Sequence, residues 1–152
     1  MMIRPATKQD VGRIQQIVEE AYSSYIERIG CKPAPMTDDH VALVASGAVW
    51  VLVSEDRIAG LIVLRIAPDH LLVSNVAVGK AYQGRGHGRK LLDHAEAFAR
   101  KAARSELRLY TNELMHENLA IYPRLGWKEY KRAEENGFRR VFLRKLLPLR
   151  TV

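Results

Sequence analysis

The sequence VAVGKAYQGRGHGRKLLDHAEAFARKA, residues 76–102, places the closely spaced glycines Gly84, Gly86 and Gly88 between an apolar run and an amphipathic run. The apolar run predicts the end of a strand, and the periodic leucines and alanines after the glycines predict a helix. A helix amino terminus presents unpaired backbone N–H groups and roughly half a positive charge from the helix dipole. Glycines allow close approach to the backbone because they carry no Cβ atom. The stretch therefore predicts an anion site, with phosphate as the best fit.

Positive charge is concentrated around this loop. The 152-residue chain has a formal net charge of +7, and the segment from Gly79 to Arg104 holds an excess of +5, seven cations minus two anions. Its cations are Lys80, Arg85, Arg89, Lys90, Arg100, Lys101 and Arg104, and its anions are Asp93 and Glu96. A compact basic site favours a phosphorylated small molecule. Nucleic acid is not expected as a partner, because only 7% of residues are aromatic and no aromatic RNA-binding signature is present.

Composition predicts one globular domain over residues 1–152, since 47% of the residues are hydrophobic and 27% are charged. No apolar run approaches the ~20 residues of a membrane-spanning helix, and MMIRPATKQD has no signal-peptide pattern. A single cysteine, Cys31, excludes an intrachain disulfide framework and suits a reducing compartment. We therefore expect a cytoplasmic protein without a membrane partner. No metal is expected, because the five histidines lack ligand spacing.

Hydrophobic periodicity predicts an alternating order of helices and strands. A capping signal at Thr7 and Asp10 begins a helix that ends at Gly30, and Thr37 or Asp38 caps a short helix through Ala45. The later elements are a hairpin of AVWVLVSE and IAGLIVLRIA, the strand LLVSNVAV, the helix after the glycines, the strand ELRLYT, a helix from about Met115 to Arg124, and a hairpin around Asn136-Gly137. This order predicts an α/β domain with a mixed sheet centred near LLVSNVAV.

The glycine spacing disfavours two common phosphate-binding folds. A nucleoside triphosphatase loop requires a lysine and a hydroxyl residue after its last glycine, and a dinucleotide fold requires G-x-G-x-x-G. Gly84, Gly86 and Gly88 match neither pattern. A glycine turn that only joins strand to helix is the remaining alternative, although three glycines exceed what such a turn requires.

Two motifs resemble the GCN5-related N-acetyltransferase (GNAT) superfamily. Val76-Ala77-Val78 followed by residues 83–88 is similar to its acyl-CoA signature, and residues 118–127 are similar to a later segment with an asparagine and a tyrosine. The resemblance covers nearly the whole chain. It implies a single-domain GNAT-like fold with a central mixed, mostly antiparallel sheet of about six to seven strands and about four flanking helices. It also implies acetyl transfer from acetyl-CoA to a primary amine of a small molecule or peptide, by direct attack in a ternary complex.

The resemblance also implies roles for single residues. The pyrophosphate falls to Gln83, Gly84, Arg85, Gly86, His87 and Gly88, mostly through backbone amides. Val76 and Val78 would lie along the pantetheine arm, and the N–H near Ala77, beside a bulge and a strand splay, would meet the thioester oxygen. Asn118 would hold the cofactor arm. Tyr122 lies four residues after Asn118 on the same face of the predicted helix, so we predict it to be the general acid that protonates the leaving thiolate. The alternative is that Tyr122 is a core aromatic residue stacked near Trp127. The His87 ring itself is expected to be solvated.

One departure leaves the general base open. Many relatives carry a glutamate on the central strand where this chain has Ser74. A water chain, Glu27, His70 and His116 are candidates to take the proton of the amine. The departure also keeps a second interpretation, an acyl-CoA-binding or regulatory module with a degenerate site.

Acceptor choice is expected in the irregular segment between the first two helices. The predicted acceptor wall consists of Tyr22, Tyr25, Glu27, Arg28 and the segment Pro33-Ala34-Pro35-Met36. Association into a homodimer is left open.

Overall fold

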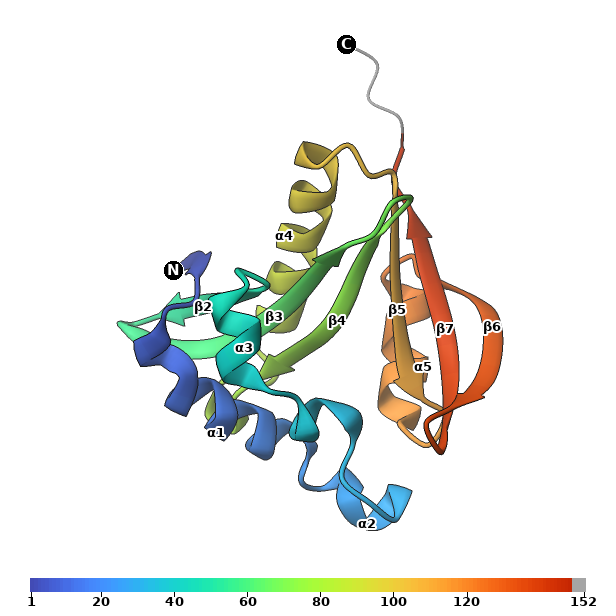
Figure 1. The fold of residues 1–152 in the computed structure, drawn as a ribbon, viewed down its shortest axis with the longest axis horizontal. Helices are drawn as coiled ribbons and strands as arrows, with labels where there is room; N and C mark the ends of the chain where they lie inside the picture. Colours follow the sequence, from blue (N-terminus) through green and yellow to red (C-terminus); the bar gives the residue numbers. More distant parts are fainter. Residues whose placement is uncertain (149–152) are drawn as a thin grey trace.

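Seven strands form one sheet in the computed structural model, which describes residues 1–148, in the order β1-β2-β3-β4-β5-β7-β6 (Figure 1). The strands are β1 (Met2–Pro5), β2 (Val49–Ser54), β3 (Arg57–Ile66), β4 (Leu71–Val78), β5 (Glu106–Asn112), β6 (Lys128–Glu135) and β7 (Phe138–Leu146). The helices are α1 (Val11–Tyr22), α2 (Tyr25–Ile29), α3 (His40–Ala45), α4 (His87–Lys101) and α5 (His116–Arg124). The single domain predicted for residues 1–152 extends over residues 149–152, which lie outside the described residues.

The sheet is mixed and mostly antiparallel, as predicted. Within the described chain, β4 and β5 form the one parallel pair, and β4 occupies the middle of the strand order. The two predicted hairpins are present, because both of their turns use positive φ at two successive residues. Glu55 and Asp56 have φ of 53° and 63°, and Asn136 and Gly137 have φ of 53° and 82°. Turns of this kind match the right-handed twist of the strands that they join.

The sheet opens where β4 and β5 separate. β4 pairs with β5 only at Leu71 and Leu72, whereas it pairs with β3 along its whole length. The register of the β3–β4 ladder shifts at Ser74, which has no partner residue on β3 and forms a β-bulge. Beyond the paired residues Leu71 and Leu72, β4 and β5 diverge (Figure 1). The bulge and the splay implied by the sequence resemblance are therefore both present.

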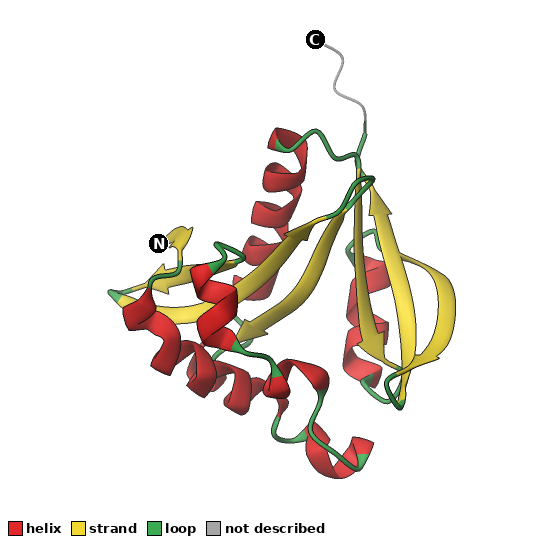
Figure 2. Ribbon diagram, in the orientation of Figure 1, coloured by secondary structure: helices red, strands yellow, loops and turns green. Residues whose placement is uncertain are grey.

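Helices cover both faces of the sheet (Figure 2). Buried side chains between the helices and the sheet form two hydrophobic cores. On one face, α4 buries Leu91, Leu92, Ala95 and Ala99 against β3, β4 and β5. On the other face, α1 buries Ile14, Ile17 and Val18 together with Leu43 of α3. The helical spacing of these apolar residues explains both arrangements. No helix among residues 1–148 has the length and apolarity needed to cross a bilayer.

Two local predictions need correction, and one strand was missed. The helix expected to run to Gly30 is interrupted at Ser23-Ser24, and serine has a lower helix propensity than the alanine, glutamate and arginine residues around it. The cap of α3 is Asp39, whose carboxylate accepts the N–H of Ala42 at 3.0 Å, rather than Thr37 or Asp38. Strand β1 was not predicted, because its four residues are too short for a periodic signal and gain their partner only in the sheet.

Candidate active site

Two cavities meet at the divergence of β4 and β5. The small cavity, of about 320 Å³, opens between these strands and the segment after α2, and the large cavity, of about 960 Å³, extends toward the glycine loop and α4. Val76, Asn118 and Tyr122 line both cavities. The two sequence motifs therefore meet at one wall, with Val76 contributed by β4 and the other two residues by α5.

The exposed edge of β4 presents backbone groups to this gap. Gly79 donates its N–H to the carbonyl of Ala59 on the β3 side at 2.8 Å. Because alternate residues of an antiparallel strand face the partner strand, Ala77 also faces β3, while the N–H and C=O groups of Val76 and Val78 face the gap. The amide expected near Ala77 is therefore that of Val76. The single Tyr22 hydroxyl proton is shared between the side-chain oxygen of Asn75, at 2.6 Å, and the carbonyl of Val76, at 3.1 Å. The Val76 N–H lies on the same edge of the strand and points into the gap.

The glycine loop has the geometry of an anion site. Gly84 and Gly86 both have φ of +79°, and a Cβ atom at either position would meet no protein atom within 4 Å. Among residues 1–148, none accepts a hydrogen bond from the backbone amides of residues 83–89. The side chain of Gln83 instead donates to the carbonyl of Val78 at 3.1 Å and holds the loop against the end of β4. Unpaired amides and open space at the start of α4 fit a pyrophosphate.

His87 is buried, whereas its ring was expected to be solvated. The residue is 5% exposed, and its ring lies 6.1 Å from the ring of Tyr82. Burial lowers the pKa of His87, with smaller contributions from the charges of Lys90 and Arg85. The imidazole lines neither cavity, so His87 contributes packing and its backbone amide to the loop.

Asn118 and Tyr122 lie one helical turn apart on α5. The side-chain amide of Asn118 donates to the hydroxyl of Thr111 at 3.1 Å, which fixes its orientation at the gap. Tyr122 is 8% exposed and packs edge-on against Trp127, with ring centroids 5.9 Å apart. Burial raises the pKa of Tyr122 to about 12. Tyr122 is therefore a core aromatic residue as well as a cavity residue, and its hydroxyl is protonated at neutral pH.

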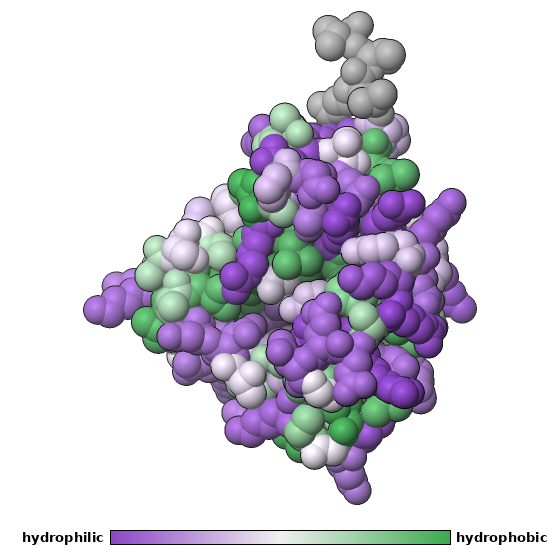
Figure 3. All heavy atoms as spheres, turned by 45° about the vertical axis from the view of Figure 1, so that its right-hand side comes forward, coloured by the Kyte–Doolittle hydropathy of each residue, from purple (hydrophilic) through white to green (hydrophobic). Residues whose placement is uncertain are grey.

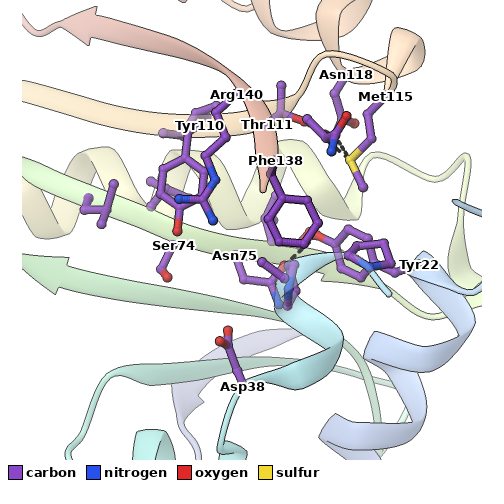
Figure 4. A pocket seen from close by; sticks show the side chains of 18 of the residues that line it. Tyr22, Asp38, Ser74, Asn75, Tyr110, Thr111, Met115, Asn118, Phe138 and Arg140 are labelled. Carbon is purple, nitrogen blue, oxygen red and sulfur yellow. Dashed lines mark hydrogen bonds between the residues drawn. The ribbon is translucent and has the colours of Figure 1, made fainter. Parts of the chain in front are cut away.

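The small cavity includes part of the predicted acceptor wall (Figure 4). Tyr22 and the segment Pro33–Pro35 line it, and the Tyr22 hydroxyl donates to the side-chain oxygen of Asn75 at 2.6 Å. Glu27, Arg28 and Met36 do not line it. Tyr25 lines the large cavity instead, and its hydroxyl donates to Glu117 at 2.6 Å.

None of the side chains suggested as general base lies in the gap. Glu27, His70 and His116 line neither cavity, and the His70 ring pairs with Asp69 at 2.7 Å in the turn between β3 and β4. Ser74 and Asp38 both line the small cavity. Burial raises the pKa of Asp38. Asp38 had been considered only as a helix cap, because no local pattern places its loop against β4.

Arg65, Asn75 and Arg140 also line the small cavity and were not singled out from the sequence. Each lies on a strand whose local pattern indicates only a strand, and their proximity depends on sheet pairing. Over the described part of the chain, no three histidine, cysteine or carboxylate side chains gather as a metal site would require.

Comparison with known proteins agrees with this geometry. A family model described as an acetyltransferase (GNAT) domain matches residues 45–129, more than half of the chain. Mouse N-alpha-acetyltransferase 80 is 37% identical over 82 residues, which are 54% of this chain and 24% of that protein. The chain thus matches about a quarter of the length of that relative.

Two solved structures share the fold. The PaiA N-acetyltransferase from Thermoplasma acidophilum in complex with coenzyme A superposes with a TM-score of 0.80 at 15% identity, covering 95% of this chain and 98% of its own. The ribosomal-protein-S18-alanine N-acetyltransferase from Escherichia coli superposes with a TM-score of 0.77 at 16% identity, covering 99% and 96%. The two motifs meet at the splayed sheet, and the acetyltransferase (GNAT) family model matches residues 45–129. The chain therefore belongs to the GNAT acetyltransferase family.

Proposed function

We propose that this protein is an acetyl-CoA-dependent N-acetyltransferase that acts on a primary amine of a small molecule or peptide. The observation that carries the proposal is the wall shared by the two cavities, formed by Val76, Asn118 and Tyr122. A donor entering from the glycine loop and an acceptor entering through the small cavity would meet at this wall.

Acetyl-CoA would occupy the large cavity and the loop at its end. The backbone amides of Gln83, Gly84, Arg85, Gly86, His87 and Gly88 would bind the pyrophosphate. The pantetheine arm would lie along the open edge of β4 and pair with the N–H groups of Val76 and Val78, over the buried Ala77. Asn118 would contact the arm from the opposite side, because α5 lines the same cavity.

The chemistry would take place at the shared wall. As the amine nitrogen bonds to the thioester carbon, negative charge develops on the carbonyl oxygen, and the Val76 N–H would stabilise it. The C–S bond would then break and release a thiolate, and the attacking nitrogen would lose its extra proton to water, which leaves a neutral amide. Tyr122 would donate its hydroxyl proton to this sulfur, since the phenol remains protonated across the neutral range.

The amine must lose a proton before it can attack. Asp38 is the one carboxylate among the described residues that line the small cavity, and its raised pKa makes it a stronger base than an exposed aspartate. We propose that Asp38 accepts the proton of the amine, directly or through a water molecule. Asp38 would thereby take the role of the glutamate that many relatives carry at the position of Ser74.

Two measurements test this function. Calorimetric titration with acetyl-CoA tests binding, and thiol release across polyamines, amino sugars, amino acids and peptides tests turnover. We expect acetyl-CoA to bind and at least one amine class to drive thiol release. Failure of acetyl-CoA to bind would overturn the proposal.

The presence of Ser74 favours a second candidate function, an acyl-CoA-binding or regulatory module. Such a module would bind acetyl-CoA but release no thiol with any amine. The same pair of measurements therefore separates the two functions.

A further inference from the structure

The small cavity presents hydrogen-bond donors and positive charge that the proposed reaction does not use. We infer that the acceptor carries a carboxylate on the same residue as its primary amine, and that Arg140, Arg65 and Asn75 bind this carboxylate. The inference rests on the proposed function and specifies its acceptor class.

Arg140 is a buried, pre-oriented cation in the cavity wall. It is 9% exposed, and its guanidinium carbon lies 4.3 Å from the ring centroid of Tyr110 and 5.7 Å from that of Phe138. One nitrogen donates to Glu135 at 3.0 Å. A guanidinium carries five N–H donors, and in residues 1–148 no other acceptor pairs with this one. Arg140 therefore retains donors for a ligand in the cavity that it lines (Figure 4).

Asn75 supplies an independent observation. The residue is 5% exposed, and its side-chain nitrogen is buried without a hydrogen-bond partner among the described residues. Its side-chain oxygen is already occupied by the Tyr22 hydroxyl. A buried donor without an acceptor is costly, so this nitrogen favours a ligand oxygen in the cavity.

The charged residues of the lining favour the same ligand. Among the described residues, the lining holds two cations, Arg65 and Arg140, and one anion, Asp38, while Glu135 pairs with Arg140 from outside the lining. The lining therefore presents cationic donors to the cavity, although the Arg140 charge is partly offset by Glu135. A carboxylate only accepts hydrogen bonds and matches the planar fork of a guanidinium. Asp38 remains available to the amine of the same ligand. A polyamine would instead place cations against two guanidinium groups.

The cavity volume of about 320 Å³ suits a ligand the size of one amino acid residue. Hydrophilic side chains dominate the face of the molecule in Figure 3. Two kinds of ligand carry a primary amine and a carboxylate on the same residue, namely a free amino acid and a peptide whose first residue is aspartate or glutamate.

The experiment compares each carboxylate-bearing acceptor with its carboxamide. The pairs are alanine with alaninamide, and a C-terminally amidated tetrapeptide that begins with Glu with the same peptide that begins with Gln. We expect kcat/KM to be about 10- to 100-fold higher for the carboxylate in one pair, the range of a charge-assisted hydrogen bond. The pair that shows the preference identifies the kind of ligand.

Substitution of the cation tests its role. Arg140→Met keeps an unbranched, apolar stem but removes the guanidinium group with its charge and donors, and it should lower the carboxylate preference to within about threefold of unity. Arg144→Met is the matched control on the same strand, because Arg144 is exposed, stacks on Tyr130 and lines neither cavity. The control should retain the preference. If Arg140→Met does not fold, the exposed Arg65→Gln provides the second test, with at least a threefold loss of preference expected.

Turnover without a preference for the carboxylate, or with a preference for spermidine, would overturn the inference but not the proposed function. A direct binding measurement keeps the two apart when no turnover occurs. The side-chain amide resonance of Asn75 should shift with the preferred carboxylate in the presence of coenzyme A and not with its carboxamide. Equal shifts for both would overturn the inference.

Discussion

At the scale of single residues, the direction of one backbone amide follows from one inserted residue. Ser74 has no partner on β3, so it shifts the register between the start of β4 and Val76 by one position. Because a one-residue shift exchanges the two edges of a strand, the bulge determines which amides face the gap. The Val76 N–H thereby reaches the wall shared by both cavities. The Val76 N–H, Tyr122 and Asp38 are the three groups to which we assign steps of the proposed reaction.

Tyr122→Phe should lower kcat by at least about tenfold, because general acid catalysis contributes ~10²- to 10⁴-fold and water can replace part of it. Acetyl-CoA affinity should stay nearly unchanged, since the aromatic packing against Trp127 is retained. The measurement is the acetyl-transfer rate in single turnover, together with calorimetric titration of acetyl-CoA.

Tyr130→Phe is the matched control, because Tyr130 is exposed and lines neither cavity. A wild-type kcat in Tyr122→Phe, under conditions where chemistry limits the rate, would show that the thiolate obtains its proton elsewhere.

Asp38→Asn should lower kcat/KM by about 10²-fold, the lower end of general base catalysis. In the wild type, Asp38 acts when deprotonated and burial raises its pKa above the ordinary value near 3.8. Activity should therefore fall as pH decreases through that raised pKa, and the variant should lose this acid limb. The measurement is kcat/KM from pH 4 to pH 9.

Asp93→Asn, on the exposed face of α4, should keep the wild-type profile. Survival of the acid limb in Asp38→Asn would assign the proton to another group.

At the scale of elements, the loop before α4 joins the end of β4 to a helix amino terminus. Gly86 caps this helix in the left-handed region at φ of +79°, and Gly84 has the same φ. A second connection joins the helices that flank the cavities, since Glu117 of α5 accepts from Tyr25 at 2.6 Å and from Arg28 at 2.7 Å on α2. The loop therefore places the unpaired amides at the end of β4, and the contacts of Glu117 hold α5 against α2.

Gly86→Asp should weaken acetyl-CoA binding by at least about 100-fold, because it places a carboxylate where unpaired amides and the helix dipole favour an anion. Aspartate tolerates the left-handed region better than most residues, so the fold should persist. Calorimetric titration gives the affinity, and circular dichroism reports the fold.

Gly86→Asn separates charge from shape, since it adds the same volume without the charge, and it should bind acetyl-CoA more tightly than Gly86→Asp. Equal affinities of the folded Gly86→Asp variant and the wild type would remove the pyrophosphate from this loop.

At the scale of the whole molecule, one ion pair joins the first strand to the helical layer. Asp10 accepts from the two guanidinium nitrogens of Arg4 at 2.8 and 3.1 Å and from the Thr7 N–H at 2.7 Å. The Arg4 hydrogen bonds, followed by those from Thr7, lower the pKa of Asp10 to about 2. Because the pKa is lower in the folded state, this stability is present above pH ~4 and is lost as pH falls toward the folded value.

Asp10→Asn should therefore lower the free energy of unfolding by about 2 kcal/mol at pH 7, since one pKa unit corresponds to ~1.4 kcal/mol. The difference from the wild type should shrink between pH 4 and pH 2. Urea unfolding at each pH measures it, with Asp56→Asn in an exposed turn as control. A difference that stays constant down to pH 2.5 would show that the loss arises from packing rather than from the ion pair.

The sequence alone predicted the elements whose signals are local. The nearly continuous apolar run LLVSNVAV predicted β4 with its bounds, Asn136-Gly137 predicted a hairpin turn, and the glycines after Val78 predicted a loop that opens a helix. Val76, Asn118 and Tyr122 were named because each belongs to a short motif that resembles the family's, and their roles in binding and catalysis stay predictions. The predictions of these elements succeed because turn geometry and helical periodicity depend on residues only a few positions apart.

Only the tertiary structure decided which distant residues share a cavity. It placed Asp38, Arg65 and Arg140 around one space, buried the ring of His87, and moved Glu27, His70 and His116 out of the gap. It also directed the amide of Val76 rather than that of Ala77 toward the gap between β4 and β5. The physical reason is that sheet register, strand splay and helix docking bring together residues from separate elements, and no local pattern encodes those distances.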